Sequence, residues 1–290
     1  MKRQARHAAR EISYAHGAQT RGGKMMIRAM ENASGRIGLI KRADGYEKEV
    51  AAGRDFWVVM AERYGLTLDV IGGSINNIPS TGPVVVISNH PYGIMDGLMM
   101  GYILSKRRKG DFKILAHNVF TKAEDINRVV LPISFEASKE AIKTNLATRK
   151  EAMRYLNEGG AIGIFPGGTV STSAKLFSHP LDPFWRAFTA RLITKTGAKV
   201  VPVFFDGHTS RMFQLASHMH NTLRKGLLIK EFKRRVDTKV GVVIGSPIAP
   251  EKLDALKSDS KGLMDFLRKS TYDLSPKPLK TLEYGYENEE

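Results

Sequence analysis

The sequence predicts an α/β fold in which a mixed, largely parallel sheet is flanked by helices on both faces and follows an N-terminal helical extension. From residue 66 onward, short apolar runs with the composition of strands alternate with longer helix-like stretches. This alternation is typical of a sheet covered by helices. Before residue 66, helix-compatible stretches are separated by glycines instead. The chain of 290 residues is long enough to bury one substantial core.

Three segments are expected along the chain. Residues 1–65 form two or three helices, and their breaks are expected at Gly17, at Gly22 and Gly23, and at Gly45. Between residues 25 and 42, apolar side chains are interleaved with basic ones, which suits either a helix at a membrane interface or a helix packed on its own domain. Residues 66–274 form the α/β domain, and residues 275–290 form a loose C-terminal tail.

Within the α/β domain the strands and helices can be located individually. Seven runs are predicted to be strands: 66–71, 84–88, 112–116, 129–133, 161–165, 199–204 and 239–245. Five stretches between them are predicted to be helices: 95–106, 138–156, 184–195, 210–221 and 262–272.

Composition excludes several classes of function. The chain has no cysteine, which removes disulfides, thiolate nucleophiles and thiolate metal ligands. Its apolar runs are far shorter than the roughly 18 residues of a spanning helix, and its N-terminus lacks the apolar core of a secretory signal, so we expect a cytoplasmic protein. The net charge of +16 attracts polyanions, but a nucleic-acid partner is disfavoured because the chain has no zinc-finger, RNA-binding or basic-zipper pattern.

The residues that follow the predicted strand 84–88 carry the first candidate site. They read Asn-His-Pro-Tyr-Gly-Ile-Met-Asp-Gly from residue 89 to residue 97. Ligands of open α/β sheets bind beyond the carboxyl ends of the strands, where His90 and Asp96 would lie. An imidazole oriented by a carboxylate is a general base that can deprotonate a hydroxyl. Because no serine lies in a G-x-S-x-G elbow, His90 would act on a hydroxyl of the substrate.

A second candidate block follows the predicted strand 161–165. It reads Pro-Gly-Gly-Thr-Val-Ser-Thr-Ser from residue 166 to residue 173. Gly167 and Gly168 would expose backbone N–H groups to a phosphate or an oxyanion, or they would simply form a tight turn that requires a positive φ. The block is not a Walker loop because it lacks the Gly-Lys-Ser/Thr ending.

A third block, Val201-Pro202-Val203, lies inside the predicted strand 199–204. In this order the three blocks resemble the glycerolipid acyltransferase family of the lysophosphatidic acid acyltransferase type, over about residues 67–250. That family carries N-H-x-x-x-x-D after a strand, then F-P-E-G-T-R-S, then V-P-V. The first block resembles a divergent N-H-P-x-G-x-x-D-G branch, in which five residues rather than four separate the histidine from the aspartate.

The resemblance implies transfer of a fatty acyl group from an acyl thioester to the hydroxyl of a lysolipid, directly and without an acyl-enzyme. His90 and Asp96 would be catalytic. The candidate substrate-binding residues are Asn89, Gly93, Gly167, Gly168, Thr169 and Ser171. No metal or other cofactor is implied, because acyl-carrier protein (acyl-ACP) or acyl-CoA is the co-substrate. The enzyme would be peripheral on the inner face of the membrane, on anionic lipid.

The departures from the family pattern bear on the acceptor. The glutamate and arginine of the second family block are here Gly167 and Val170. In the family these side chains are associated with a phosphate-bearing acceptor, so both 1-acylglycerol-3-phosphate and a lyso-aminolipid such as lyso-ornithine lipid are open. The alternative function is a non-catalytic peripheral membrane-binding protein on the same fold.

Overall fold

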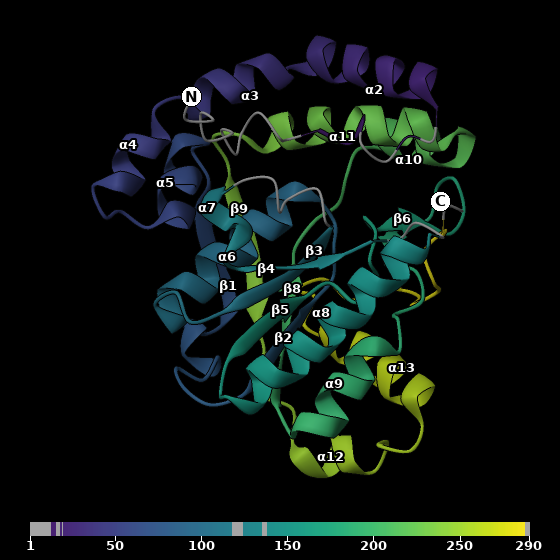
Figure 1. Ribbon diagram of the computed structural model, residues 1–290. Helices are drawn as coiled ribbons and strands as arrows, with labels where there is room; N and C mark the ends of the chain where they lie inside the picture. The colour runs from purple at the N-terminus through teal and green to yellow at the C-terminus, as the bar shows by residue number, and fades with distance from the viewer. Residues whose placement is uncertain (1–12, 16–17, 19, 118–123, 135–137, 288–290) are drawn as a thin grey trace.

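The computed structural model describes residues 13–15, 18, 20–117, 124–134 and 138–287 (Figure 1). Its main sheet has seven strands in the order β1-β9-β8-β2-β5-β3-β4. The strands are β1 (Thr67–Gly73), β2 (Val84–Ser88), β3 (Lys113–His117), β4 (Val130–Ile133), β5 (Ala161–Ile164), β8 (Lys199–Phe205) and β9 (Lys239–Ile244). All neighbours are parallel except β8 and β9. The prediction of a mixed, largely parallel sheet is therefore confirmed, and each strand lies within one or two residues of its predicted bounds.

Helices cover both faces of this sheet. The central strand β2 is buried along its whole length, with Val84 and Val86 in one hydrophobic core and Val85 and Ile87 in another. The first core is shared with α5 (Phe56–Arg63), α6 (Ile94–Arg108) and α11 (Asn221–Arg235). The second core is shared with α8 (Lys139–Asn157), α9 (Phe188–Thr196) and α13 (Ser260–Tyr272). Alternate side chains of one strand point to opposite faces, which is why a run of consecutive apolar residues is required here.

The N-terminal region contains four helices among the described residues, where two or three were expected. They are α2 (Arg21–Ser34), α3 (Arg36–Ala43), α4 (Tyr46–Ala51) and α5. Gly35 and Gly45 separate α2, α3 and α4 with φ values of 115° and 83°. The expectation of a break at Gly22 and Gly23 was wrong, because both glycines lie in the first turn of α2. Thr20 caps this helix, and its hydroxyl accepts a hydrogen bond from the N–H of Gly23 at 3.0 Å. Gly17 lies outside the described residues.

A pair of helices follows β8. The expected helix over 210–221 is α10 (Arg211–Met219), and the long helix α11 directly after it was not predicted. The segment has many basic residues between its apolar positions, which hid its amphipathic pattern. In the structure α2 lies along α11 (Figure 1), so the N-terminal region packs on the α/β domain.

The C-terminal segment after α13 contains neither helix nor strand as far as Glu287. It nevertheless contacts the domain: Arg268 of α13 donates hydrogen bonds to the carbonyls of Leu282 and Glu283, at 2.9 and 3.0 Å. Leu279 and Leu282 pack on a small buried cluster that contains Phe204.

The remaining elements are short. They are η2 (Ile75–Asn77), α7 (Glu124–Asn127), α12 (Pro250–Asp254) and the antiparallel ribbon of β6 (Thr172–Ser173) and β7 (Pro180–Leu181). Across the described residues, every helix is too short or too polar to cross a membrane.

Candidate active site

The first block leaves the sheet at the carboxyl end of β2. Asn89, the residue after the strand, is buried, and its side-chain amide donates to the carbonyl of Phe205 at 2.9 Å and accepts from the N–H of Phe205 at 2.8 Å. These two hydrogen bonds join the ends of β2 and β8. They also fix the direction in which the chain enters the next residue, His90.

The turn after His90 brings the aspartate of the block back to the histidine. Gly93 has a φ of 76°, a conformation that favours glycine, and α6 begins at Ile94. Oδ2 of Asp96 accepts hydrogen bonds from the N–H groups of Tyr92 and Gly93, at 2.7 and 3.0 Å. Asp96 therefore caps the N-terminus of α6, where a negative charge is favourable. The turn absorbs the additional residue of the first block.

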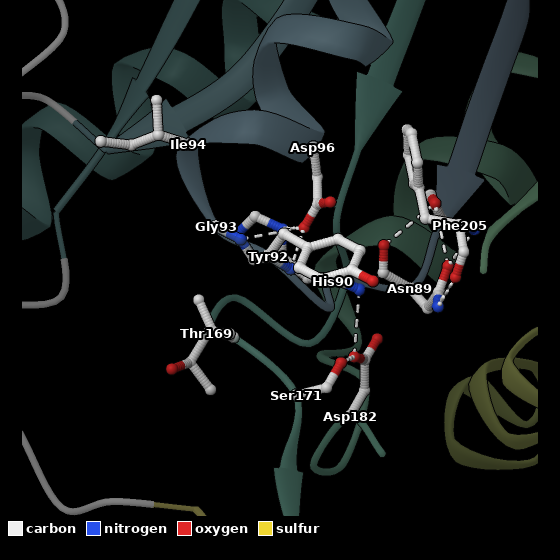
Figure 2. Close-up of polar contacts among 12 residues, drawn as sticks. Asn89, His90, Tyr92, Gly93, Ile94, Asp96, Thr169, Ser171, Asp182 and Phe205 are labelled. Carbon is white, nitrogen blue, oxygen red and sulfur yellow. Dashed lines mark hydrogen bonds and ion pairs between the residues drawn. The ribbon is translucent and has the colours of Figure 1, made fainter. Parts of the chain in front are cut away.

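His90 and Asp96 form a close pair. Nδ1 of His90 lies 2.9 Å from Oδ2 of Asp96, and the Asp96 side chain has no exposed area, whereas 17% of the His90 side chain is exposed (Figure 2). Burial raises the pKa of Asp96, and the His90 ring and the two capping amides oppose this rise. The His90 ring also stacks on Phe165, with the ring centres 4.3 Å apart and the planes at 27°. The carboxylate of Asp96 thus lies at the Nδ1 edge of the imidazole and Phe165 packs on one face of the ring, which leaves Nε2 as the ring nitrogen that can act as a general base.

The second block forms a turn beside His90. The N–H of Gly168 closes this turn on the carbonyl of Phe165 at 3.0 Å, and Gly168 has a φ of 71°. Its amide is therefore already used. The N–H groups of Gly167 and Thr169 donate to no other described residue, so these two amides are the ones that the turn can offer to a ligand.

Backbone and side-chain hydrogen bonds join the two blocks. The N–H of Ser171 donates to the carbonyl of His90 at 2.8 Å. The hydroxyl of Ser171 donates to Oδ1 of Asp182, and the same oxygen accepts from the N–H of His90 at 3.1 Å (Figure 2). Asp182 directly follows β7 and was not predicted as a site residue. Nothing in its local sequence marks it, because its partners lie 11 and 92 residues away along the chain.

Arg224 of α11 is the second residue that the sequence did not reveal. Its guanidinium is buried and donates to the hydroxyl of Thr169 at 3.0 Å, to the carbonyl of Val170 at 2.6 Å and to the hydroxyl of Thr172. It also donates to the hydroxyl of Ser217 at 3.0 Å. The turn at residue 170 has lost the arginine of the family pattern, yet a guanidinium from a distant helix holds the same turn.

The predicted site residues thus divide into two sets. His90, Asp96, Gly167 and Thr169 lie together at the carboxyl end of the central strand. His90, Gly167 and Thr169 are on the two joined turns, and Asp96 is in the first turn of α6. Asn89 and Ser171 are buried and their side chains are already hydrogen-bonded to protein groups, and the N–H groups of Gly93 and Gly168 are used within their own turns. Across the described ranges, no three His, Asp or Glu side chains are grouped so that they could hold a metal ion.

The part of the chain that carries the His–Asp pair and the glycine-rich turn is similar to known proteins. Residues 72–206, which include both turns, match the family model described as Acyltransferase. This match and the curated relatives described next support the assignment of the chain to the glycerolipid acyltransferase family, and the chain is an acyltransferase.

Two curated relatives match about three quarters of the chain, and a third matches about half of it. It is 23% identical over 219 residues to a lyso-glycine lipid O-acyltransferase of Phocaeicola vulgatus, covering 72% of this chain and 74% of the relative. It is 25% identical over 226 residues to a lyso-glycine lipid O-acyltransferase of Bacteroides thetaiotaomicron, covering 74% and 78%. A 1-acyl-sn-glycerol-3-phosphate acyltransferase of Borreliella burgdorferi is 26% identical over 140 residues, covering 48% of this chain and 51% of the relative.

A solved structure is also similar. It is the 1-acyl-sn-glycerophosphate (LPA) acyltransferase PlsC from Thermotoga maritima, with a TM-score of 0.47 and 16% identity, covering 92% of this chain and 87% of that one.

Proposed function

We propose that this enzyme moves a fatty acyl group from an acyl thioester to the hydroxyl of a lysolipid, with His90 as the general base. The observation that carries the proposal is the 2.9 Å contact between Nδ1 of His90 and the buried carboxylate of Asp96. Asp96 holds the proton on Nδ1, which leaves Nε2 to accept a proton from the substrate.

The proposed reaction takes place in one transfer without an acyl-enzyme. Nε2 of His90 removes the proton from the lysolipid hydroxyl while the hydroxyl oxygen attacks the thioester carbonyl carbon. The carbon–sulfur bond then breaks, and the departing thiolate takes the proton back from His90. The N–H groups of Gly167 and Thr169 are the donors that we assign to the oxyanion of the intermediate, since the N–H of Gly168 is occupied.

We favour a lyso-aminolipid such as lyso-glycine or lyso-ornithine lipid as the acceptor over 1-acylglycerol-3-phosphate. Two curated lyso-glycine lipid O-acyltransferases match 72% and 74% of the chain, whereas the 1-acyl-sn-glycerol-3-phosphate enzyme matches 48%. The turn also lacks a local arginine to bind a phosphate, since residue 170 is a buried valine. The donor is acyl-ACP or acyl-CoA, both anionic, which suits a chain of net charge +16.

We propose further that the enzyme works at the surface of an anionic membrane. Large apolar side chains are exposed on α2, on α10 and on the turn after β6. The helices α2 and α10 both pack on α11, and α10 also contacts β6 at the end of the second block (Figure 1). They are Met25, Met26, Leu176, Phe177, Met212, Leu215 and Met219, and we call them the exposed apolar surface. Lys24, Lys175 and Arg211 lie exposed among them. Exposed apolar side chains flanked by basic ones are typical of a surface that binds an anionic membrane.

The position of this surface suits a lipid acceptor. The N–H of Ser173, at the end of the second block, donates to the buried amide oxygen of Gln214 on α10 at 2.8 Å. The exposed apolar surface therefore borders the turn that carries Gly167 and Thr169. A lysolipid could present its hydroxyl to His90 while its chain remains near the membrane.

The test is acyl transfer by the purified protein from labelled acyl-ACP or acyl-CoA to a panel of lyso-glycine lipid, lyso-ornithine lipid and lysophosphatidic acid. The variant His90→Ala should lose at least about a hundredfold in kcat. The matched control is His220→Asn, because His220 is exposed, only caps α11 at 3.0 Å, and is replaced by another good capping residue. Equal turnover by His90→Ala and the parent would refute the general-base role, and no transfer to any acceptor would refute the substrate class.

A further inference from the structure

Asp182 is a buried carboxylate that connects the two halves of the candidate active site. Its side chain has no exposed area and accepts three hydrogen bonds from neutral donors. Oδ1 accepts the N–H of His90 at 3.1 Å and the hydroxyl of Ser171, and Oδ2 accepts the indole N–H of Trp185 at 2.9 Å. Figure 2 shows Asp96 and Asp182 approaching the segment that carries His90 from different sides.

Gly167 allows this carboxylate to come close to the second turn. A Cβ atom at residue 167 would lie 3.3 Å from Cβ of Asp182 and 3.4 Å from its Oδ2. A larger residue at 167 would therefore press on Asp182. The turn has lost its own acidic residue, and the carboxylate beside it comes instead from the end of β7.

The backbone of Asp182 is fixed as firmly as its side chain. Its N–H donates to the hydroxyl of Tyr272 at 2.7 Å, and its carbonyl accepts from Arg268 at 3.0 Å and from the N–H of Gly285 at 2.9 Å. Tyr272 and Arg268 belong to α13, and Gly285 belongs to the C-terminal segment. A Cβ at Gly285 would lie only 1.9 Å from the carbonyl oxygen of Leu181, so the segment can lie this close only with glycine there.

We propose that Asp182 is a positioning residue for the acyl transfer. It holds the backbone of His90 and the turn that carries Gly167 and Thr169 in one geometry, and α13 and the C-terminal segment hold Asp182 in place. Reacting groups must be positioned to within a fraction of an ångström, and such positions depend on the residues that support them. This inference rests on the proposed role of His90.

The variant Asp182→Asn separates the charge of this residue from its shape. The amide oxygen can still accept the two hydrogen bonds at Oδ1, but the NH2 group then faces the indole N–H of Trp185, and two donors oppose each other. The double variant Asp182→Asn/Trp185→Phe removes the opposing donor. The variant Trp185→Phe alone is the matched control.

We expect Asp182→Asn to lower kcat by about 10- to 100-fold with less than a threefold change in KM, because Asp182 acts on the position of His90 and not on substrate. The double variant should recover most of this loss, and Trp185→Phe should stay within about threefold of the parent. Kinetics are normalised to the folded fraction measured by circular dichroism. Parental kcat in Asp182→Asn, or loss of activity that only follows the folded fraction, overturns the proposal.

A second readout does not depend on turnover. The His90 ring resonance is assigned by its absence in His90→Ala, and Asp182→Asn should shift that resonance, whereas His220→Asn should not. If the parent transfers no acyl group to any lysolipid, the proposed function fails while this measurement still tests Asp182. An unchanged His90 resonance in Asp182→Asn overturns the positioning role even if the enzyme is active.

Discussion

Asn89 and Phe205 exchange two hydrogen bonds across the ends of β2 and β8: the side-chain amide of Asn89 donates to the carbonyl of Phe205 at 2.9 Å and accepts its N–H at 2.8 Å. Both residues are buried. The asparagine next to the candidate base thus satisfies two backbone groups that the sheet leaves unpaired. Its side chain is not available to a substrate, and we assign it the role of holding the strand ends together.

Replacing Asn89 should therefore reduce stability before it affects chemistry. Asn89→Ala leaves two buried backbone groups of Phe205 without partners, which should lower the free energy of unfolding by about 2–4 kcal/mol. Chemical denaturation measures the loss. Asn76→Ala is the control, since Asn76 is exposed in the short helix η2. A midpoint for Asn89→Ala equal to that of the control would contradict this assignment.

Asp96 should contribute to activity at the expense of stability. Burial raises the pKa of Asp96 in the folded protein, so Asp96 ionises at a lower pH in the unfolded chain than in the folded one. The free energy of unfolding therefore falls as the pH rises, until the pH passes the pKa of the folded state. At neutral pH, Asp96→Asn should then unfold at the same or a higher denaturant concentration than the parent, and this difference should shrink toward pH 4. Its kcat/KM should fall by about 10²- to 10⁴-fold.

The same raised pKa predicts the acid limb of the parental pH–rate profile. Activity requires ionised Asp96. As the pH is lowered, kcat/KM should therefore begin to fall at a pH that is higher than the ordinary pKa of an aspartate. An acid limb at the ordinary aspartate pKa, or a clearly less stable Asp96→Asn at neutral pH, would show that burial does not control this carboxyl.

Arg224 should hold the second turn in place of the arginine that the turn itself lacks. Arg224→Met leaves the hydroxyl of Thr169 and the carbonyl of Val170 without this donor, and we expect a loss of about 2–4 kcal/mol in unfolding free energy and at least a tenfold loss in kcat/KM. Arg224→Lys should rescue little, since an ammonium cannot replace the planar fork. Arg234→Met, on an exposed position of the same helix, should behave like the parent in thermal unfolding.

The exposed apolar surface should bind anionic vesicles. Phe177 is 91% exposed. Phe177→Ser should weaken binding to phosphatidylglycerol-containing vesicles by about tenfold, because the binding free energy loses the roughly 1.5 kcal/mol that burial of this side chain in the membrane would contribute. Leu146→Ser is the control because Leu146 is 66% exposed on α8, outside this surface. Co-sedimentation at low and high salt measures both. Equal loss in the two variants would mean that apolar exposure alone, and not this surface, drives binding.

Most of the fold was predictable because its signals are local. The four buried residues Val84 to Ile87 have the composition of a strand covered on both faces, and β2 lies there. One exception was α11, whose apolar positions are separated by lysines and arginines. Its buried face becomes evident only in the structure, where α11 packs on α2, α10 and α3.

The candidate site was predictable in part for the same reason. His90 and Asp96 lie within one strand–turn–helix unit, so the residues that bring them together are their sequence neighbours. Asp182 and Arg224 contact the same two turns from 92 and 55 residues away along the chain, and no spacing rule connects them.

By itself, the sequence determined the alternation of strands and helices, the turn that pairs His90 with Asp96, and the family that these motifs resemble. Only the tertiary structure decided that Asn89 and Ser171 point inward, that the amide of Gly168 is already used, and that Asp182 and Arg224 support the site. The physical reason is range. Backbone propensity and hydrophobic periodicity act over a few residues, whereas the partners of a buried polar group are set by how distant elements pack.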